Sequence, residues 1–215
     1  LYINDTLSVS AGGITIDAVS FSSASYPSST GRSLTLGSID ADNNDQSTYW
    51  CSATSSYGAG DLGTPGSSND TCTGLPVGLS SLSAGDLVIS EVMVDPAQVS
   101  DYRGEWFEVY NRSNSAVNLS GLQVSSQGES GFTVSSTVVI PAAGYAVLGV
   151  RDNTAINGGV TVDYRYIYGE VKLYINDQLS IAFSGTTFDS VSLNSSSYPS
   201  ATGRSLFTGA LDATL

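Results

Sequence analysis

Apolar residues along this chain fall in short runs, and the runs are bounded by Gly, Pro, Asn and Ser. They are rich in Tyr, Val, Ile and Thr, which favour pleated, half-buried strands. Runs that recur every 8–12 residues or so, with turn residues between them, predict an all-β sandwich without long helices. The clearest runs span residues 87–94, 106–110 and 144–150, and weaker runs span 160–168, 171–175, 179–183, 188–193 and 204–207.

One block of sequence occurs twice. Residues 1–43 and 173–215 both begin Leu-Tyr-Ile-Asn-Asp, and they match without a gap at about 25 of 43 positions. The offset of 172 residues is far longer than a solenoid repeat and is typical of one domain with its linker. We therefore expect the chain to begin inside one domain and to end inside the next. It would then be a window on a tandem array or a permuted subunit that other copies complete.

The repeat divides the chain into three parts. We expect residues 1–72 to be the C-terminal part of one sandwich, residues 73–85 to be a linker, and residues 86–215 to be a second sandwich without a disulfide segment. Residues 86–172 are called the front part below, and 1–72 and 173–215 are each called a back part. A half sandwich leaves unpaired strand edges and an uncovered apolar face. The front part must therefore pair with 173–215 or with 1–72, and in either case one back part remains uncovered.

Composition excludes several functions. The chain carries 20 acidic and 7 basic residues, and a net charge of −13 disfavours nucleic acids and anionic membranes as partners. No apolar run is long enough to insert into a bilayer. The chain has no histidine, which excludes Ser-His-Asp and Cys-His catalysis. We therefore expect a non-enzymatic protein.

The two cysteines, Cys51 and Cys72, lie in one segment rich in Gly, Ser and Asp. An even cysteine count in such a context predicts a disulfide and an oxidising compartment, so we expect an extracellular or cell-surface location. Trp50 is expected to pack on this disulfide, and Trp106 is expected to fill the centre of the core.

Carboxylates are the other candidate functional groups, because Ca²⁺ binds carboxylate and carbonyl oxygens. Glu91 and Glu108 lie within apolar runs, on strands expected to be neighbours, where an acid needs a partner or an ion. Asp95, Asp101 or Glu105 could complete a calcium site there. Alternatively, the two glutamates face solvent or accept hydrogen bonds from arginines.

A second acidic segment resembles the start of a calcium-binding loop, with Asp40, Asp42, Asn44 and Asp45. It lacks the glycine that an EF-hand has at its sixth position, and Cys51 stands where the bidentate glutamate belongs. An irregular calcium-binding turn and an Asx-rich turn that satisfies its own backbone both remain possible interpretations. Ca²⁺ is the one cofactor that the sequence suggests.

Four motifs of the front part occur in a fixed order, and the first back part carries three more. The front motifs are residues 89–93, 104–111, 117–122 and 140–145, and the back motifs are residues 42–45, 50–51 and 60–69. This ordered set resembles the lamin tail domain as found in bacterial extracellular proteins. The resemblance implies an immunoglobulin-like β-sandwich that serves as a non-catalytic module, which in bacteria is appended to secreted nucleases, phosphatases, proteases and surface proteins.

Together these features predict an extracellular structural protein whose partner is itself. Head-to-tail pairing between a front part and the back part of a neighbour does not close, and it would give a surface filament or tandem-repeat fibre. Two alternatives remain open: an accessory binding module of a larger secreted nuclease or phosphatase, and a Ca²⁺-dependent adhesin. No nucleic-acid partner and no membrane insertion are expected.

Overall fold

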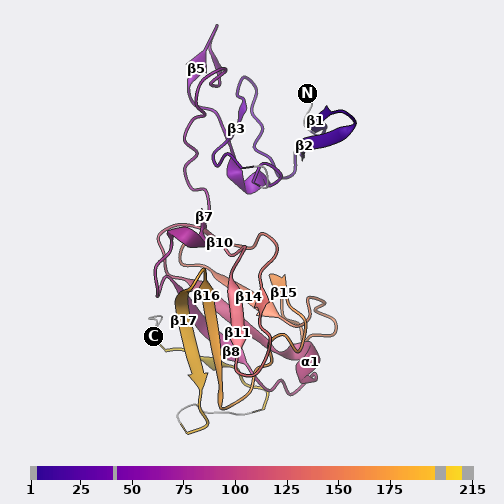
Figure 1. Cartoon of the computed structure of the whole chain (residues 1–215), viewed down its shortest axis with the longest axis vertical. Coiled ribbons are helices and arrows are strands. Elements are labelled where there is room, and N and C mark those ends of the chain that lie inside the picture. Colours follow the sequence, from indigo (N-terminus) through magenta and orange to yellow (C-terminus); the bar gives the residue numbers. More distant parts are fainter. Residues whose placement is uncertain (1–3, 41–42, 197–201, 210–215) are drawn as a thin grey trace. The chain divides into compact units, whose positions relative to one another are not determined.

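The computed structural model describes residues 4–40, 43–196 and 202–209. The chain divides into two compact units, Leu1–Leu75 (unit 1) and Pro76–Leu215 (unit 2), which are drawn in Figure 1. Strands dominate both units, and helix is confined to α1 (Asp101–Gly104) and two 3₁₀ turns, η1 (Ser47–Tyr49) and η2 (Leu79–Ser81), among the described residues. The all-β prediction is therefore confirmed.

Unit 2 is built from two larger sheets and a small one. The five-stranded sheet has the order β15 (Tyr164–Arg165), β14 (Tyr145–Gly149), β9 (Trp106–Asn111), β8 (Leu87–Met93) and β18 (Leu206–Phe207). The four-stranded sheet has the order β12 (Phe132–Thr133), β11 (Gln123–Ser126), β16 (Asp177–Phe183) and β17 (Thr186–Leu193). The three-stranded sheet joins β13 (Val139–Ile140), β10 (Val117–Asn118) and β7 (Val77–Gly78).

The core of unit 2 lies between the two larger sheets. Alternate residues of β9 point inward, and Phe107 and Val109 are fully buried there. The opposite sheet contributes Ile181 and Phe188, which are equally buried. This arrangement is the sandwich that the strand pattern predicted. Trp106 is only half-buried, because it alternates with Phe107 and faces outward, so its expected place at the core centre was wrong.

The back part 173–215 completes the front part within unit 2. Strand β16 pairs antiparallel with β11 of the front part, and β18 pairs antiparallel with β8. Strand β17 continues the hairpin from β16 and closes over β8 from the other sheet. Of the two pairings that the sequence left open, the structure has the front part paired with 173–215.

The expected linker at 73–85 differs from the structure over most of its length. Residues 73–75 belong to unit 1, and β7 pairs in parallel with β10 inside unit 2. Leu79 is buried in the core of unit 2. The many Ser and Gly residues around it hid these few apolar residues, whose burial makes 76–85 part of the sandwich.

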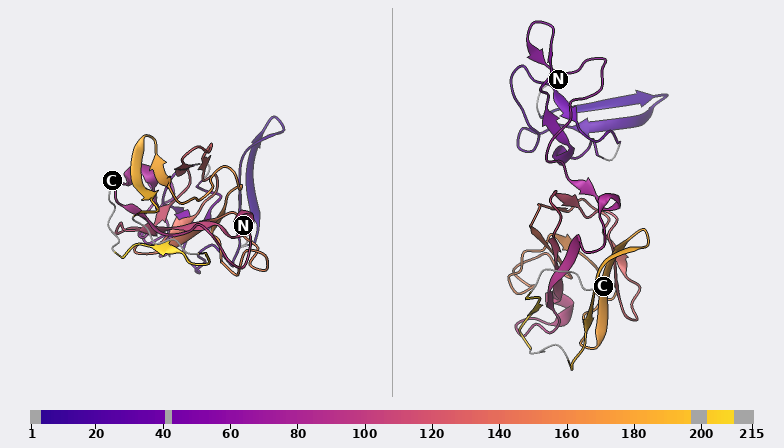
Figure 2. Two further views of the ribbon diagram at one scale, coloured as in Figure 1. Left: turned by 90° about the horizontal axis from the view of Figure 1, so that it is seen from below. Right: turned by 90° about the vertical axis from the view of Figure 1, so that its left-hand side faces the viewer.

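Unit 1 consists of three separate two-stranded sheets among its described residues. They are β1 (Thr6–Ala11) with β2 (Ile14–Ser20), β3 (Leu34–Leu36) with β4 (Trp50–Ser52), and β5 (Ser56–Tyr57) with β6 (Asp61–Leu62). Edge-to-face contacts among Phe21, Tyr26 and Trp50 form a small aromatic cluster. Figure 2 shows the β1–β2 hairpin, in indigo, projecting from the rest of unit 1.

Candidate functional site

The β1–β2 hairpin of unit 1 and the β16–β17 hairpin of unit 2 are the same structure at an offset of 172 residues. Leu7 lies opposite Val19 as Leu179 lies opposite Val191. Both hairpins carry a bulge at the same position, after Val9 in one and after Ile181 in the other. The duplicated sequence therefore adopts one local geometry in two different settings.

The residues around the hairpins repeat this geometry. Asn4 and Asn176 both have positive φ, of 72° and 70°. Each accepts a hydrogen bond at its Oδ1 from a backbone N–H nineteen residues later, from Ser23 and from Ser195. Asparagine tolerates this left-handed backbone better than most residues, which explains why both copies keep it.

The apolar faces of the two hairpins are in opposite environments. Leu179, Ile181 and Phe188 of unit 2 are at most 1% exposed, because the five-stranded sheet covers them. Their counterparts in unit 1 are 45% exposed for Leu7, 56% for Val9 and 67% for Ile16. Single exposed apolar residues are common on proteins, but a contiguous apolar strand face marks an interaction surface. The β1–β2 hairpin is therefore the candidate functional site of this chain.

Two aspartates show what the uncovered hairpin lacks. Asp177 Oδ1 accepts hydrogen bonds from its neighbour Gln178 N and from Gln127 N beyond the end of β11. Its counterpart Asp5 accepts from the neighbouring Thr6 N. The local bond is thus present in both copies, while the bond to the front part occurs in unit 2.

The second aspartate pair follows the same rule. Asp189 Oδ1 accepts from Ser190 N, and its Oδ2 accepts from Ile89 N on β8 at 2.8 Å. Asp17 Oδ1 likewise accepts from Ala18 N, whereas its Oδ2 accepts from the side chain of Asn44. Burial raises the pKa of Asp189. Asp189 is therefore a buried acceptor that joins the two sheets, and Asn44 takes the place of the front part in unit 1.

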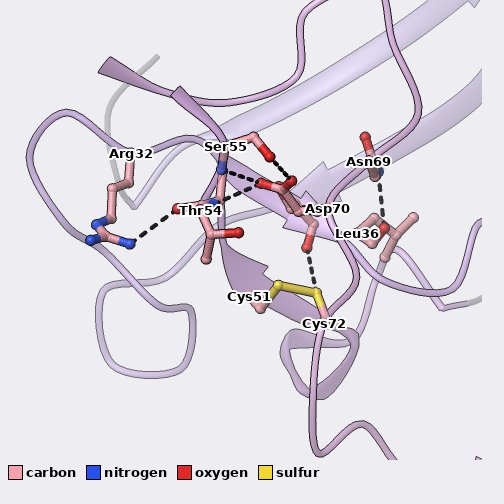
Figure 3. Close-up of a disulfide and its surroundings, with 10 residues drawn as sticks. Arg32, Leu36, Cys51, Thr54, Ser55, Asn69, Asp70 and Cys72 are labelled. Carbon is pink, nitrogen blue, oxygen red and sulfur yellow. Dashed lines mark hydrogen bonds between the residues drawn. A yellow bond between two sulfur atoms is a disulfide. The ribbon is translucent and has the colours of Figure 1, made fainter. Parts of the chain in front are cut away.

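The disulfide lies in unit 1, behind the hairpin in sequence. Cys51 on β4 is bonded to Cys72, as the cysteine count predicted. Figure 3 shows the polar contacts around it, in which Asp70 accepts hydrogen bonds from Thr54 N, Ser55 N and Ser55 Oγ. These bonds, that of the Ser55 hydroxyl first, lower the pKa of Asp70 to about 2. The segment between the cysteines is therefore fixed by a covalent and a polar tie.

The predicted calcium ligands of the front part accept hydrogen bonds from within unit 2. Glu91 and Glu108 are cross-strand neighbours on β8 and β9, as expected. Glu108 Oε1 accepts from Ser90 Oγ, and Glu91 Oε1 accepts from Ser205 Oγ of the back part. Asp95 Oδ2 accepts from Thr202 Oγ1. Glu91 and Asp95 thus anchor the back part to the front part through hydroxyl groups.

The remaining calcium candidates are spread over both units. Glu105 is buried in unit 2 at 1% exposure, and Asp40, Asn44 and Asp45 lie in unit 1. Asp42 lies outside the described residues. In the part of the chain that the structure describes, no three carboxylate or cysteine side chains gather as a metal site. Calcium binding therefore stays a prediction, which a comparison of the melting temperature with Ca²⁺ and with a chelator tests.

Sequence reasoning missed the residues that receive the back part. Strand β11 has one apolar residue, Val124, among Gln123, Ser125 and Ser126, so it gave no strand signal. Asp177 and Asp189 also went unnoticed. Their signal was present in the repeat, since Asp5 and Asp17 occupy the same positions in the first copy.

The comparisons with known proteins agree with this architecture. A family model described as the lamin tail domain matches residues 80–197, which is more than half of the chain and spans both the front part and the β16–β17 hairpin. No curated protein and no solved structure matches the chain. Among the described residues, no helix has the length and apolar character that a membrane crossing requires. On the extent of the family match and the sandwich of unit 2, this chain belongs to the lamin tail domain family.

Proposed function

We propose that this chain is a non-enzymatic extracellular structural protein, a subunit or repeat of a surface filament whose lamin-tail sandwiches are joined by strand complementation. One observation carries the proposal. The β1–β2 hairpin has the register and bulge of a sandwich hairpin, yet its apolar face lies open. Lamin tail domains are non-catalytic immunoglobulin-like modules, which agrees with a structural role.

The energetics favour covering this face. Complete burial of a Leu, Val or Ile side chain contributes about 1.5–3 kcal/mol, and three such residues lie open on the hairpin. Association costs several kcal/mol in lost freedom, so the apolar face alone would give modest affinity. Backbone hydrogen bonds along the open strand edge add to it, as in other cases of strand addition. The Cys51–Cys72 disulfide supports the extracellular location, since such bonds persist in oxidising compartments.

Electron microscopy and sedimentation of the purified chain test the proposal. We expect filaments or head-to-tail oligomers that grow with concentration, because such contacts do not close. Ile16→Asp places a charge on the open apolar face and should abolish assembly. Thr15→Asp is the matched control, because its counterpart Thr187 stays exposed in the covered hairpin. Dispersed particles at every concentration would contradict the filament and favour the accessory module of a secreted enzyme.

A further inference from the structure

The chain itself contains the surface that fits the open hairpin. In unit 2, the outer strand of the hairpin, β16, pairs with β11 in a fixed register: Ser126 lies opposite Leu179, Ser125 opposite Ser180 and Val124 opposite Ile181. The counterparts of the last three residues are Leu7, Ser8 and Val9 of β1. Strand β1 pairs with β2 on one side, and β1 has no strand on its other side among the described residues. The edge that β11 would occupy is therefore open.

Strand β3 of unit 1 offers a second point of attachment. Its counterpart β18 pairs with β8 through alternate residues, and Thr208 N donates to Ser90 O. In unit 1 the opposite set of alternate residues bonds to β4, since Gly37 N donates to Tyr49 O. Leu36, which corresponds to Thr208, therefore faces the edge of β3 that is turned away from β4. Strand β3 can thus pair with a β8 strand and with β4 at the same time.

From these matches we propose that the front part of a second copy of this chain is the partner of the open hairpin. The inference rests on the proposed function and specifies its interface. Strand β1 pairs with β11 of the second copy in the register that β16 uses, with Ser8 opposite Ser125. Asp5 accepts from Gln127 N of the second copy, and Asp17 accepts from its Ile89 N. Leu7, Val9 and Ile16 enter the core of that copy at the places of Leu179, Ile181 and Phe188.

Docking requires the second copy to release its own back part, and the incoming back part is the more complete of the two. β3 brings with it β4 and the Cys51–Cys72 disulfide. β18 is two residues long and ends its sheet among the described residues, and its Phe207 is 78% exposed. The counterpart of Phe207 is Thr35, which is 3% exposed. Exchange therefore adds β4 to the sheet, and strand pairing of this kind supplies backbone hydrogen bonds that β18 does not offer.

Engineered cysteines in the full chain test this register. Residues directly opposite each other on antiparallel strands have Cβ atoms about 4.5–5.5 Å apart, which permits a disulfide with little movement. We expect the Ser8→Cys/Ser125→Cys variant, under mild oxidation, to give a ladder of dimers, trimers and larger species on non-reducing gels. Each single variant should stop at dimers. Ser125→Cys/Ser180→Cys is the folding control, because these positions face each other within unit 2 and should cross-link inside one chain.

Three results would overturn the interface. The first is an equal ladder from Ser10→Cys/Ser125→Cys, which is two residues out of register. The second is cross-linked monomer alone from Ser8→Cys/Ser125→Cys, which would place the hairpin on its own chain. The third is filament formation by the wild type with no ladder from this variant. In that third case the proposed filament stands and this interface fails, whereas the absence of any self-association rejects both.

Discussion

Glu105 Oε2 accepts a hydrogen bond from the backbone N–H of Leu173 at 3.1 Å, and this bond joins the front part to the first residue of the back part. The carboxyl group is 1% exposed, and its Oε1 has no hydrogen-bond partner among the described residues. Burial raises the pKa of Glu105 from 4.5 to about 8, and the negative charge of Asp101 contributes in the same direction. The seam of the sandwich therefore contains a carboxyl group that is neutral near pH 7.

The first prediction is that unit 2 loses stability as the pH rises. Below pH 4.5 Glu105 is protonated in the folded and unfolded states alike. Between pH 4.5 and about 8 the unfolded chain releases this proton and the folded chain keeps it, so the free energy of unfolding falls through that window. Glu105→Gln keeps an acceptor for Leu173 N without the proton. The free energy of unfolding of the variant should therefore fall less over the window, by about 3 kcal/mol.

Urea unfolding followed by fluorescence checks this prediction. Trp50→Phe leaves Trp106 as the tryptophan reporter of unit 2 and serves as the common background. Parallel pH profiles for the background chain and its Glu105→Gln variant would mean that the carboxyl group is not held neutral in the fold.

The second prediction concerns the buried bond from Asp189 to Ile89 N. Asp189→Ala leaves this backbone N–H without a partner between the sheets, which should lower the free energy of unfolding of unit 2 by about 2 kcal/mol. Asp189→Asn keeps an acceptor oxygen and should recover most of that loss. Asp17→Ala is the matched control in unit 1 and should leave the Trp106 transition unchanged. An equal loss with Ala and Asn would assign the effect to the charge rather than to the hydrogen bond.

The third prediction compares one core position with its uncovered counterpart. Phe188→Ala empties a fully buried site and should destabilise unit 2 by about 3–5 kcal/mol. Ile16→Ala changes a side chain that is 67% exposed and should cost less than about 0.5 kcal/mol in dilute, unassembled protein. Calorimetry at low concentration measures both. A large loss for Ile16→Ala under those conditions would show that Ile16 is already packed in the single chain.

The fourth prediction is that the disulfide stabilises unit 1 alone. Cys51 and Cys72 are 21 residues apart, and closing such a loop contributes about 3 kcal/mol on the chain-entropy account. Cys51→Ser/Cys72→Ser should lower the unfolding midpoint of unit 1, with Trp50 as the reporter in a Trp106→Phe background. The unit 2 transition in the Trp50→Phe background should not move. A shift in both transitions would show that the two units unfold together.

The sequence predicted the sandwich because β8, β9 and β14 are compact apolar runs with strong strand character. It left the identity of the completing back part open, because both copies carry the same hairpin sequence. The choice depends on tertiary contacts such as Asp189 with Ile89 N, which join residues 100 positions apart. It also missed β11, whose Ser and Gln side chains hide a strand that is fixed by backbone pairing on both sides.

The candidate site shows the same limit of sequence reasoning. Glu91 and Glu108 were expected as buried acids, but each alternates with an inward-facing apolar residue and accepts a serine hydroxyl. Glu105, which precedes β9, is the acid that is fully enclosed. Exposure of Leu7 against burial of Leu179 is invisible to composition, because the two sequences are nearly alike and only their surroundings differ.

Amide hydrogen exchange of the β1–β2 hairpin tests the central claim most directly. The account predicts that the peptide covering Thr6–Ser20 exchanges fast in dilute protein and becomes protected as the chain assembles, approaching the protection of the Gln178–Ser192 peptide. Ile16→Asp should abolish the gain in protection, and Thr15→Asp should retain it. Fast exchange of Thr6–Ser20 in protein that sedimentation shows to be fully assembled would contradict the claim that this hairpin is the joining element.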